Sequence, residues 1–200
     1  MVFPRLIDFK ERISDVGIMR QRVAEAALGH VLELGGENGA NLFLYPRSIT
    51  SLTSLTAIRA VPQGTRRSSR QLPFPVDRRS GYLNAFPLKN HAYDTVVSTF
   101  ALAAANNLAQ TLREIKRVLK PGGRLLFLEF GRSPDASVAR WQRRCAPLLR
   151  VLSGARQPLQ DIDGEIVTGG FSLKHLECGY LIRLPRALGC VCEGVAFNDP

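Results

Sequence analysis

The sequence predicts an α/β fold in which a mostly parallel, doubly wound sheet forms one domain over residues 1–200. Short apolar runs alternate with segments of helical period, and a glycine-rich turn follows the first apolar run. Strands that alternate with helices form parallel sheets with right-handed crossovers, which place helices on both faces. The last two apolar runs lie close together, so we expect an antiparallel strand at the sheet edge.

The first part of the chain is expected to form helices and two strands. Apolar residues recur every three or four positions from Arg5 to Leu28, within an N-terminal helical segment of residues 1–29. His30 to Leu34 reads HVLEL and leads into glycines, which predicts a buried strand and a turn. Leu42 to Tyr45 is expected to open a second helix that the next residue, a proline, interrupts. Ser48 to Leu55 alternates apolar and hydroxyl residues and is expected to form the second strand.

An arginine- and proline-rich stretch, residues 61–90, follows this part. It has no clear period, so we expect it to be mostly an exposed loop. Its arginines are the candidate contact residues for a partner, with a solvated insertion as the alternative: Arg66, Arg67, Arg70, Arg78 and Arg79. Aromatic side chains for base stacking are sparse there, which makes nucleic acid a less favoured partner.

Regular structure is expected to return after residue 90. Asp94 to Phe100 is β-branched and apolar, which predicts a central strand. Asn106 or Asn107 can cap a helix with one apolar face, and Arg124 to Glu129 is the next buried strand. The order of these elements continues the alternation of strands and helices.

The C-terminal part is expected to add one helix and two strands. Ala136 to Leu152 has a helical pattern, and an irregular segment then continues to Gly170. Phe171 to Phe197 is expected to form two strands broken around Pro185.

The charge of the chain favours anionic partners. The net charge is +10 and the isoelectric point is about 10.1. A field of this sign attracts an acidic protein, nucleic acid or an anionic membrane surface. An arginine-rich source proteome is the alternative explanation of the same charge.

Cysteine usage and hydropathy bear on the compartment. The four cysteines are too few and too scattered for a disulfide framework, so we expect small core residues in a reducing compartment and no metal site. No apolar run approaches the ~18 residues of a transmembrane helix, and the first residues lack the pattern of a signal peptide. We therefore expect a cytoplasmic protein, with a place beside a membrane or a large complex left open.

Three motifs, in this order and spacing, closely resemble class I S-adenosylmethionine (SAM)-dependent methyltransferases. They are VLELGGENGAN from Val31, YDTVVSTFAL from Tyr93 and LREIKRVLKPGGRLLFLEF from Leu112. The resemblance is to the ubiquinone/menaquinone-biosynthesis C-methyltransferase (methyltransferase type 11) branch and is weakest between residues 49 and 83. It implies a Rossmann-like methyltransferase fold with SAM at the turn after the first strand. The cofactor-lining residues it implies are Glu33, Gly35, Gly39, Asn41, Asn84, Ser98 and Thr99.

The sequence departs from the family pattern at the positions expected to hold SAM. Glu37 stands where the family turn G-x-G-x-G has its middle glycine, and pairing of its carboxylate with the ammonium or sulfonium of SAM is the alternative interpretation. Thr53 stands where we expect the acidic residue that accepts hydrogen bonds from the ribose, and Tyr82 replaces the acidic residue near the adenine. Phe130 replaces a histidine that is frequent in close relatives. These changes predict weak or absent binding of SAM.

Two main hypotheses of function follow from the motifs and their departures. The first is a pseudoenzyme that keeps the fold and binds an acidic protein or anionic surface. The second is an active methyltransferase that acts on a small apolar, quinone, lipid or thiol acceptor. In the second, Glu129 is the candidate that orients the acceptor, and no other catalytic residue is assigned. A pocket repurposed for another small molecule is a third hypothesis.

Overall fold

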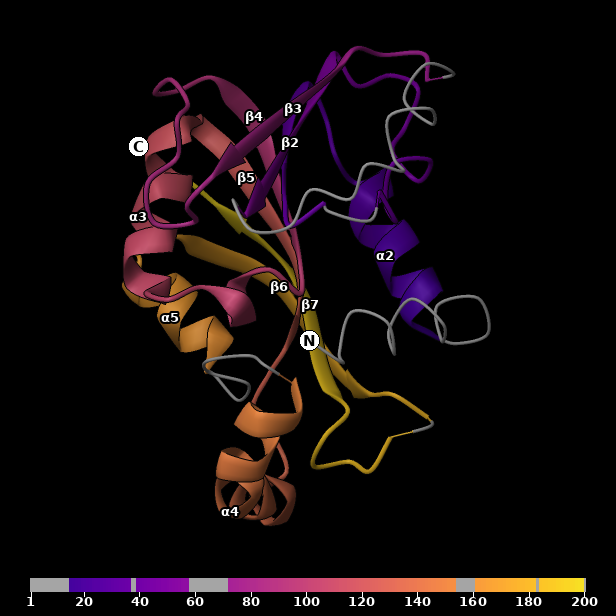
Figure 1. Cartoon of the computed structure of the whole chain (residues 1–200), viewed down its shortest axis with the longest axis vertical. Coiled ribbons are helices and arrows are strands. Elements are labelled where there is room, and N and C mark those ends of the chain that lie inside the picture. Colours follow the sequence, from indigo (N-terminus) through magenta and orange to yellow (C-terminus); the bar gives the residue numbers. More distant parts are fainter. Residues whose placement is uncertain (1–14, 37–38, 58–71, 154–160, 183, 200) are drawn as a thin grey trace.

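A seven-stranded sheet with the order β3-β2-β1-β4-β5-β7-β6 forms the centre of the molecule (Figure 1). The computed structural model describes residues 15–36, 39–57, 72–153, 161–182 and 184–199. The strands are β1 (His30–Leu34), β2 (Ser51–Ala57), β3 (Val76–Gly81), β4 (Tyr93–Thr99), β5 (Leu119–Phe130), β6 (Ser172–Tyr180) and β7 (Cys190–Phe197).

The pairing of the strands confirms the predicted fold class. β3, β2, β1, β4 and β5 pair in parallel, whereas β7 runs antiparallel to both β5 and β6. The antiparallel strand therefore lies near the sheet edge, with β6 as the outermost strand beside it. Because the carboxyl ends of parallel strands share one edge of a sheet, the loops after β1, β2 and β4 lie at the same end.

Helices cover both faces of the sheet. α2 (Asp15–Glu25) lies on one face, and α3 (Leu108–Val118) and α5 (Ile162–Thr168) lie on the other (Figure 1). α4 (Ala136–Ser153) projects beyond the sheet on the side where β5 ends. This arrangement is that of a doubly wound α/β domain.

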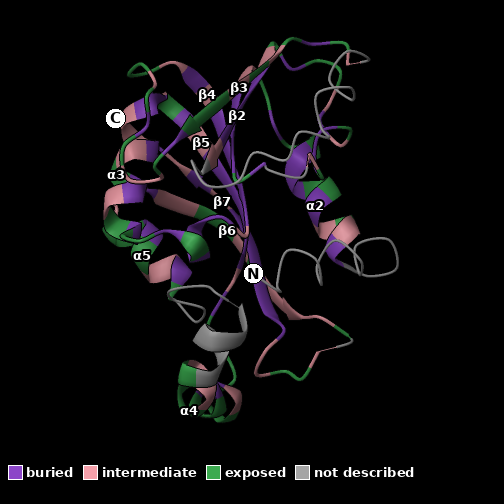
Figure 2. Ribbon diagram, viewed as in Figure 1, coloured by how far each residue is buried: buried purple, intermediate pink, exposed green. Residues whose placement is uncertain are grey.

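The sheet separates two buried cores, drawn in purple in Figure 2. Alternate residues of a strand point to opposite faces, so adjacent residues of β1 belong to different cores. The core under α3 and α5 includes Leu32, Leu34, Leu112, Ile115, Phe127 and Ile166. The core under α2 includes Val23, Ala27, Val31, Leu52, Val97 and Leu126.

α3 shows how local sequence determines an element. The side chain of Asn107 accepts a hydrogen bond from the Gln110 backbone N–H (3.0 Å), which confirms the second of the two predicted caps. The apolar face of the helix is buried against the sheet. Lys116 and Arg117 lie in the last turn, where the helix dipole favours cations.

Two predictions about local structure were wrong, and a third missed one strand. Residues 42–45 form a turn and not the start of a helix. The segment expected to be irregular contains α5. The stretch expected to be mostly loop is turn or irregular over most of its described part, 72–90, but contains β3. β3 is an edge strand whose exposed side chains give no apolar alternation, and α5 buries only Ile162 and Ile166. Neither element has enough apolar residues to be recognised by periodicity.

The expectation of reduced cysteines is also corrected. Cys178 of β6 and Cys192 of β7 stand opposite each other in the antiparallel ladder and form a disulfide. Their separation of 14 residues does not reveal the pairing, because the register of the two strands creates it. Cys190 is buried and free, as expected for a small core residue.

Candidate functional site

The turn after β1 has the backbone geometry that the motif predicts. Gly35 and Gly39 have positive φ angles of 73° and 63°, which glycine adopts without strain. The Gly35 N–H donates to the Leu55 carbonyl (3.0 Å), which holds the turn at the carboxyl end of β2. Glu33, Gly35 and Gly39 therefore lie together at the carboxyl end of an interior parallel strand, as predicted. Glu37 lies outside the described residues.

A buried cluster of polar side chains fills the α2 side of this turn. Asn41 Nδ2 donates to Glu33 Oε1 and to Thr99 Oγ1, both at 2.9 Å. The guanidinium of Arg20 on α2 donates to Asn41 Oδ1 (3.1 Å) and, at 3.5 Å, to Thr99 Oγ1. All four side chains are buried. We call Arg20, Glu33, Asn41 and Thr99 the polar cluster.

The carboxyl group of Glu33 has one engaged oxygen and one that lacks a partner. Oε1 accepts from Asn41, whereas Oε2 makes no hydrogen bond among the described residues. The hydroxyls of Tyr45 and Ser54 lie close enough to lower the pKa of Glu33, but neither has hydrogen-bond geometry to it. Burial outweighs these effects and raises the pKa of Glu33. A side chain at Gly36 would collide with the Glu33 carboxyl and the Ser54 hydroxyl.

Two phenylalanines lie beside the polar cluster. Phe100 follows β4, has a positive φ of 58°, and packs against Phe130 at the end of β5 with ring centroids 4.7 Å apart. The Arg20 guanidinium lies over the Phe100 ring, 5.3 Å from its centroid. A positive φ in a phenylalanine is strained, so the surrounding packing must hold it.

Glu129 is a buried structural cap in this arrangement. Its Oε1 accepts from the Ser98 hydroxyl (2.7 Å) and from the backbone N–H groups of Ala101 and Leu102 (3.0 Å each). Its Oε2 accepts from Ala103 N–H (3.3 Å), at the start of the short 3-10 helix Leu102–Ala104. Burial raises the pKa of Glu129 to about 7 against these hydrogen bonds. Ser98 is therefore buried and bound to Glu129.

The predicted position of the ribose acceptor was wrong. Thr53 pairs with Leu32 in the middle of the β1–β2 ladder and is buried. The residues at the carboxyl end of β2 are Thr56 and Ala57, and the Thr56 hydroxyl donates to the Arg79 carbonyl (3.2 Å). The error arises because threonine recurs in SITSLTSLT, so the sequence alone does not set the register. Neither residue at this strand end carries a charge.

The positions expected near the adenine lie in a turn after β3. Tyr82 forms an isolated bridge to Ala85 and is 62% exposed, and Asn84 is half-buried in the same turn. Neither has a side-chain hydrogen bond among the described residues.

The residues present fit one half of SAM and not the other. Glu33 and Arg20 provide a carboxylate and a guanidinium, the groups that bind the ammonium and carboxylate of an amino acid. The neutral end of β2 provides no charged acceptor for the ribose hydroxyls.

The candidate contact arginines are divided by the structure. Arg78 and Arg79 lie on β3 and not in a loop, and Arg79 Nε pairs with Asp77 (2.8 Å). Arg66, Arg67 and Arg70 lie outside the described residues.

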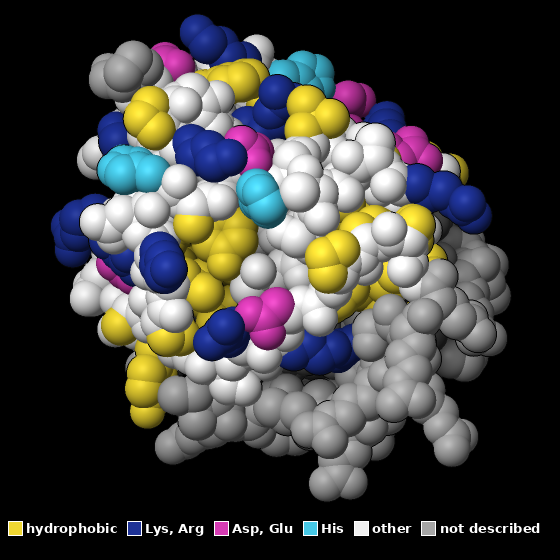
Figure 3. Space-filling view, turned by 90° about the horizontal axis from the view of Figure 1, so that it is seen from above, with side chains coloured by type: hydrophobic (Ala, Val, Ile, Leu, Met, Phe, Trp, Pro, Cys, Tyr) yellow, Lys and Arg dark blue, Asp and Glu magenta, His cyan; other side chains and the backbone are white. Residues whose placement is uncertain are grey.

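A second surface lies at the opposite end of the sheet, seen in Figure 3. A groove of about 440 Å³ there is lined by His91, Arg113, Lys116, Arg117, Pro121, Asn198 and Asp199. Lysine and arginine side chains on this face are interspersed with acidic, histidine and apolar side chains (Figure 3). In the described part of the chain, no three His, Cys, Asp or Glu residues are grouped to hold a metal ion. No helix there is long and apolar enough to cross a membrane.

Sequence reasoning missed Arg20, Tyr45 and Ser54. Arg20 interrupts a helix face that otherwise buries Val16 and Val23, and this interruption is the signal that could have identified it. Tyr45 and Ser54 gave no such signal, because only the fold brings them to Glu33.

Comparisons with known proteins agree with the fold and the turn. A methyltransferase domain family matches residues 32–127. The ubiquinone/menaquinone biosynthesis C-methyltransferase of Rubrivivax gelatinosus is 34% identical over 104 residues, which are 50% of this chain and 39% of that protein. The rat (Rattus norvegicus) thiol S-methyltransferase is 29% identical over 150 residues, 74% of this chain and 62% of that protein. The chain thus spans less than two thirds of the length of these curated relatives.

Solved structures share the fold at low identity. The methyltransferase in a complex with the Haloferax volcanii Trm112 methyltransferase activator has a TM-score of 0.74 at 16% identity, covering 98% of this chain and 95% of that one. The [4+2]-cyclase SpnF has a TM-score of 0.68 at 17% identity, covering 94% of this chain and 80% of that one. Sheet order, glycine turn and sequence relatives together support one family for this chain, that of the class I SAM-dependent methyltransferases.

Proposed function

We propose that this chain is a methyltransferase-fold protein that binds SAM weakly and acts by binding an anionic partner, without transferring a methyl group. The observation that carries the proposal is the polar cluster, in which the groups expected to receive the cofactor already bond to one another. The cluster is buried and linked to α2 through Arg20.

The polar cluster has the kinds of group that suit the methionine end of SAM, but these groups are already bonded to one another, so SAM gains little by binding there. Glu33 Oε1 and Asn41 Nδ2 are already paired, so a ligand must exchange existing hydrogen bonds for new ones. An exchange of this kind contributes much less to the free energy of binding than a new hydrogen bond to an unpaired group does. The Arg20 charge also lies near the position that a cationic cofactor would approach.

The ribose end lacks a charged acceptor. Losing one charge-assisted contact weakens binding by about 1.5–3 kcal/mol, or roughly ten- to a hundredfold in affinity. Thr56 donates its hydroxyl hydrogen to the Arg79 carbonyl and offers the ribose a single neutral oxygen as acceptor. A neutral hydroxyl is also a weaker acceptor than a carboxylate.

Glu129 does not supply acid–base chemistry in this proposal. Both of its oxygens accept hydrogen bonds from the protein itself. Its role is to hold the loop after β4, a structural function that requires no substrate.

The anionic nature of the partner rests on charge. The net charge of +10 favours an acidic protein or an anionic surface over a neutral partner. The fold can hold a protein partner, because one solved structure that shares it is a complex with a methyltransferase activator.

One observation favours the alternative, an active methyltransferase. Glu33 Oε2 is buried without a partner beside Tyr45 and Ser54, which leaves an acceptor for a ligand ammonium. SAM would supply an activated methyl group, and the protein would align it with a quinone, lipid or thiol acceptor.

Calorimetric titration of the pure protein with SAM and with its demethylated product tests the proposal. We expect dissociation constants in the millimolar range for both ligands. A micromolar constant, together with methyl transfer to a quinone or thiol acceptor, would overturn the proposal in favour of the active enzyme.

A further inference from the structure

α4 differs from the other described helices because most of it lies away from the sheet. It projects beyond the end of β5 (Figure 1), and exposed residues cover much of its described surface (Figure 2). Ala139 and Gln142 are its buried residues among those whose side chains are described. The helix is thus attached at its first turns and presents its outer face to the surroundings.

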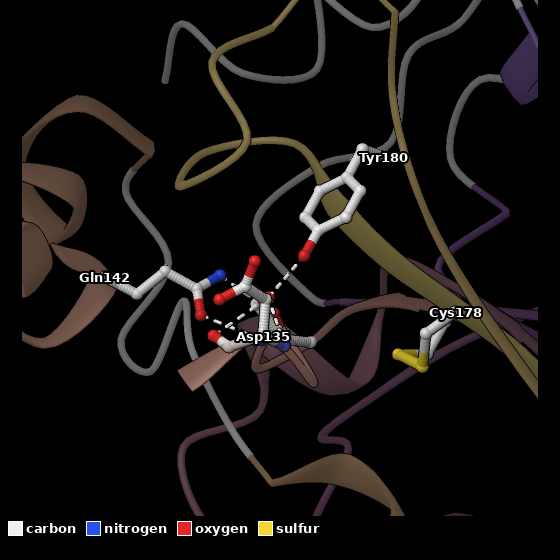
Figure 4. Close-up of a disulfide and its surroundings, with 7 residues drawn as sticks. Asp135, Gln142, Cys178 and Tyr180 are labelled. Atoms are coloured by element: carbon white, nitrogen blue, oxygen red, sulfur yellow. Dashed lines mark hydrogen bonds between the residues drawn. A yellow bond between two sulfur atoms is a disulfide. The ribbon is translucent and has the colours of Figure 1, made fainter. Parts of the chain in front are cut away.

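The attachment of α4 is well defined. Gln142 Oε1 accepts from the Ser133 backbone N–H (2.8 Å), and its Nε2 donates to the Gly131 carbonyl (3.2 Å). The carboxylate of Asp135 accepts from the Ser137 N–H (2.8 Å) at the start of the helix. The hydroxyls of Ser133 and Tyr180 share a hydrogen bond, which connects the segment before α4 to β6 beside the disulfide (Figure 4). These contacts hold the direction of α4 relative to the domain.

The outer face of α4 combines arginines with the only tryptophan of the chain. Arg140, Arg143 and Arg144 are exposed, and Trp141 is 60% exposed. At about 100° per residue these four side chains span roughly 160° of the helix circumference, centred away from Ala139 and Gln142, with Arg143 nearest the buried side. None of the three arginines makes an ion pair with another described residue. The sequence of α4 has no aspartate or glutamate.

The β6–β7 loop adds a second exposed apolar residue near the start of α4. Ile182 is 83% exposed. The Arg186 guanidinium lies 5.2 Å from the centroid of the Tyr180 ring, and Tyr180 is bound to Ser133. The loop and the start of α4 are therefore neighbours. We call Arg140, Trp141, Arg143, Arg144 and Ile182 the α4 rim.

We propose that the α4 rim docks on the surface of an anionic lipid bilayer. Arginines attract anionic headgroups, and tryptophan is suited to the boundary between headgroups and acyl chains. A helix with a basic polar side and an exposed aromatic residue lies in that boundary and does not span it. Trp141 and Ile182 favour a bilayer over an acidic protein, because their exposed apolar surface has no use in a purely ionic contact.

Docking on a bilayer names the anionic partner of the proposed function, and it rests on that function only for the negative charge of the partner. The SAM titration and the lipid experiment are separate measurements. Tight SAM binding would refute the proposed function and leave the result of the vesicle experiment unchanged. Absent vesicle binding would refute docking on a bilayer and leave the SAM dissociation constant unchanged.

The fluorescence of Trp141 provides a direct test. The full chain is mixed with vesicles of phosphatidylcholine alone or of phosphatidylcholine with phosphatidylglycerol, and binding is followed by co-sedimentation. We expect binding to the anionic vesicles alone, with a blue shift of the emission and quenching by brominated lipids. Because the chain has one tryptophan, the shift reports the α4 rim itself.

Charge-matched variants separate the α4 rim from net charge. Changing Arg140, Arg143 and Arg144 together to Ser should weaken vesicle binding by roughly tenfold or more. The matched control changes three exposed basic residues outside α4, Arg47, Lys89 and Arg113, to Ser, which removes the same charge elsewhere, and should weaken it by less than about twofold. Trp141→Ser with Ile182→Ser should also weaken binding, whereas Val167→Ser, at an exposed apolar residue of α5, should not.

Three outcomes would overturn the inference. The first is no binding to the anionic vesicles while circular dichroism shows a folded protein. The second is equal weakening by the two triple variants, which would assign binding to net charge. The third is vesicle binding that leaves the Trp141 emission unchanged and that soluble polyglutamate abolishes. This result would assign the surface to an acidic protein.

Discussion

Arg20 shows how one residue can change the properties of a binding turn. It reaches from α2 to Asn41 and Thr99 and lies over Phe100 at the carboxyl end of β4. Its charge lowers the pKa of Glu33, while burial raises that pKa by more. The polar cluster is therefore balanced internally and needs no ligand to satisfy most of its groups.

Restoring the cofactor residues should recover SAM binding. The variant Glu37→Gly with Thr56→Asp removes bulk from the turn and places a carboxylate at the true end of β2. We expect it to bind at least about tenfold more tightly than the unmodified chain in calorimetry, since a charge-assisted contact is regained. The control Glu37→Gly with Thr53→Asp places the charge in the buried middle of the strand. Equal recovery by the control would show that the strand-end argument is wrong.

Glu129 should make stability depend on pH. Burial raises the pKa of its carboxyl from 4.5 to about 7, so the folded state favours the protonated form. Its contribution is then fully present below about pH 4.5 and is lost as the pH rises to about 7, a change of about 3 kcal/mol. Glu129→Gln should remove this part of the pH dependence, as measured by urea unfolding from pH 4 to pH 8.

Glu114 provides the contrast for this measurement. Its hydrogen bond with Arg117 lowers the pKa of its carboxyl. Its contribution is therefore present above its ordinary pKa and is lost as the pH falls. Glu114→Gln should remove a loss of stability that the unmodified chain shows as the pH falls below the ordinary pKa of a glutamate, whereas Glu129→Gln should remove a loss that occurs as the pH rises. A profile of Glu129→Gln that parallels the unmodified chain would contradict the assignment.

Some helices and strands are determined by their own sequence, and others by contacts with neighbouring elements. α3 carries its own cap, apolar face and basic last turn, so it is recognisable alone. β3 and α5 form because β2 and α3 offer them a surface. Isolated short helices and edge strands are marginal in water, so such elements depend on tertiary contacts.

The cap of α3 can be tested by one substitution. Asn107→Ala removes the acceptor for the Gln110 N–H and should lower the free energy of unfolding by about 1 kcal/mol. Asn106→Ala, at the exposed neighbouring asparagine, should have little effect. Chemical denaturation of both variants gives the comparison, and an equal loss in both would refute Asn107 as the cap.

At the scale of the whole molecule, the sheet joins residues that are distant in the sequence. β5 lies between β4 and β7, so the C-terminal hairpin completes a sheet that the first half of the chain begins. The disulfide closes this hairpin. Its effect on stability includes the unfolded chain, whose freedom the link restricts.

Removing the disulfide should therefore destabilise the whole fold. For a link that spans 14 residues, changing Cys178 and Cys192 to Ser should lower the free energy of unfolding by about 3 kcal/mol. Cys145→Ser, at a free cysteine of α4, serves as the control and should change it by less than about 0.5 kcal/mol. A double variant as stable as the control would mean that the link does not form in solution.

The sequence by itself determined the parts of this protein whose causes are local. The β1 turn, β4, the cap of α3 and the apolar run of β5 follow from glycine, β-branching, capping and period, all of which act within about ten residues. The positive charge and the family motifs are also properties of the sequence alone.

The tertiary structure decided what depends on register and on distant contacts. Pairing of β1 with β2 moved the strand end from Thr53 to Thr56, and pairing of β6 with β7 joined two cysteines. The approach of α2 to β4 placed Arg20 in the polar cluster, 79 residues from Thr99 in sequence. A shift of one residue in a strand reverses which side chains face a core, so such contacts exist only once the whole sheet is assembled.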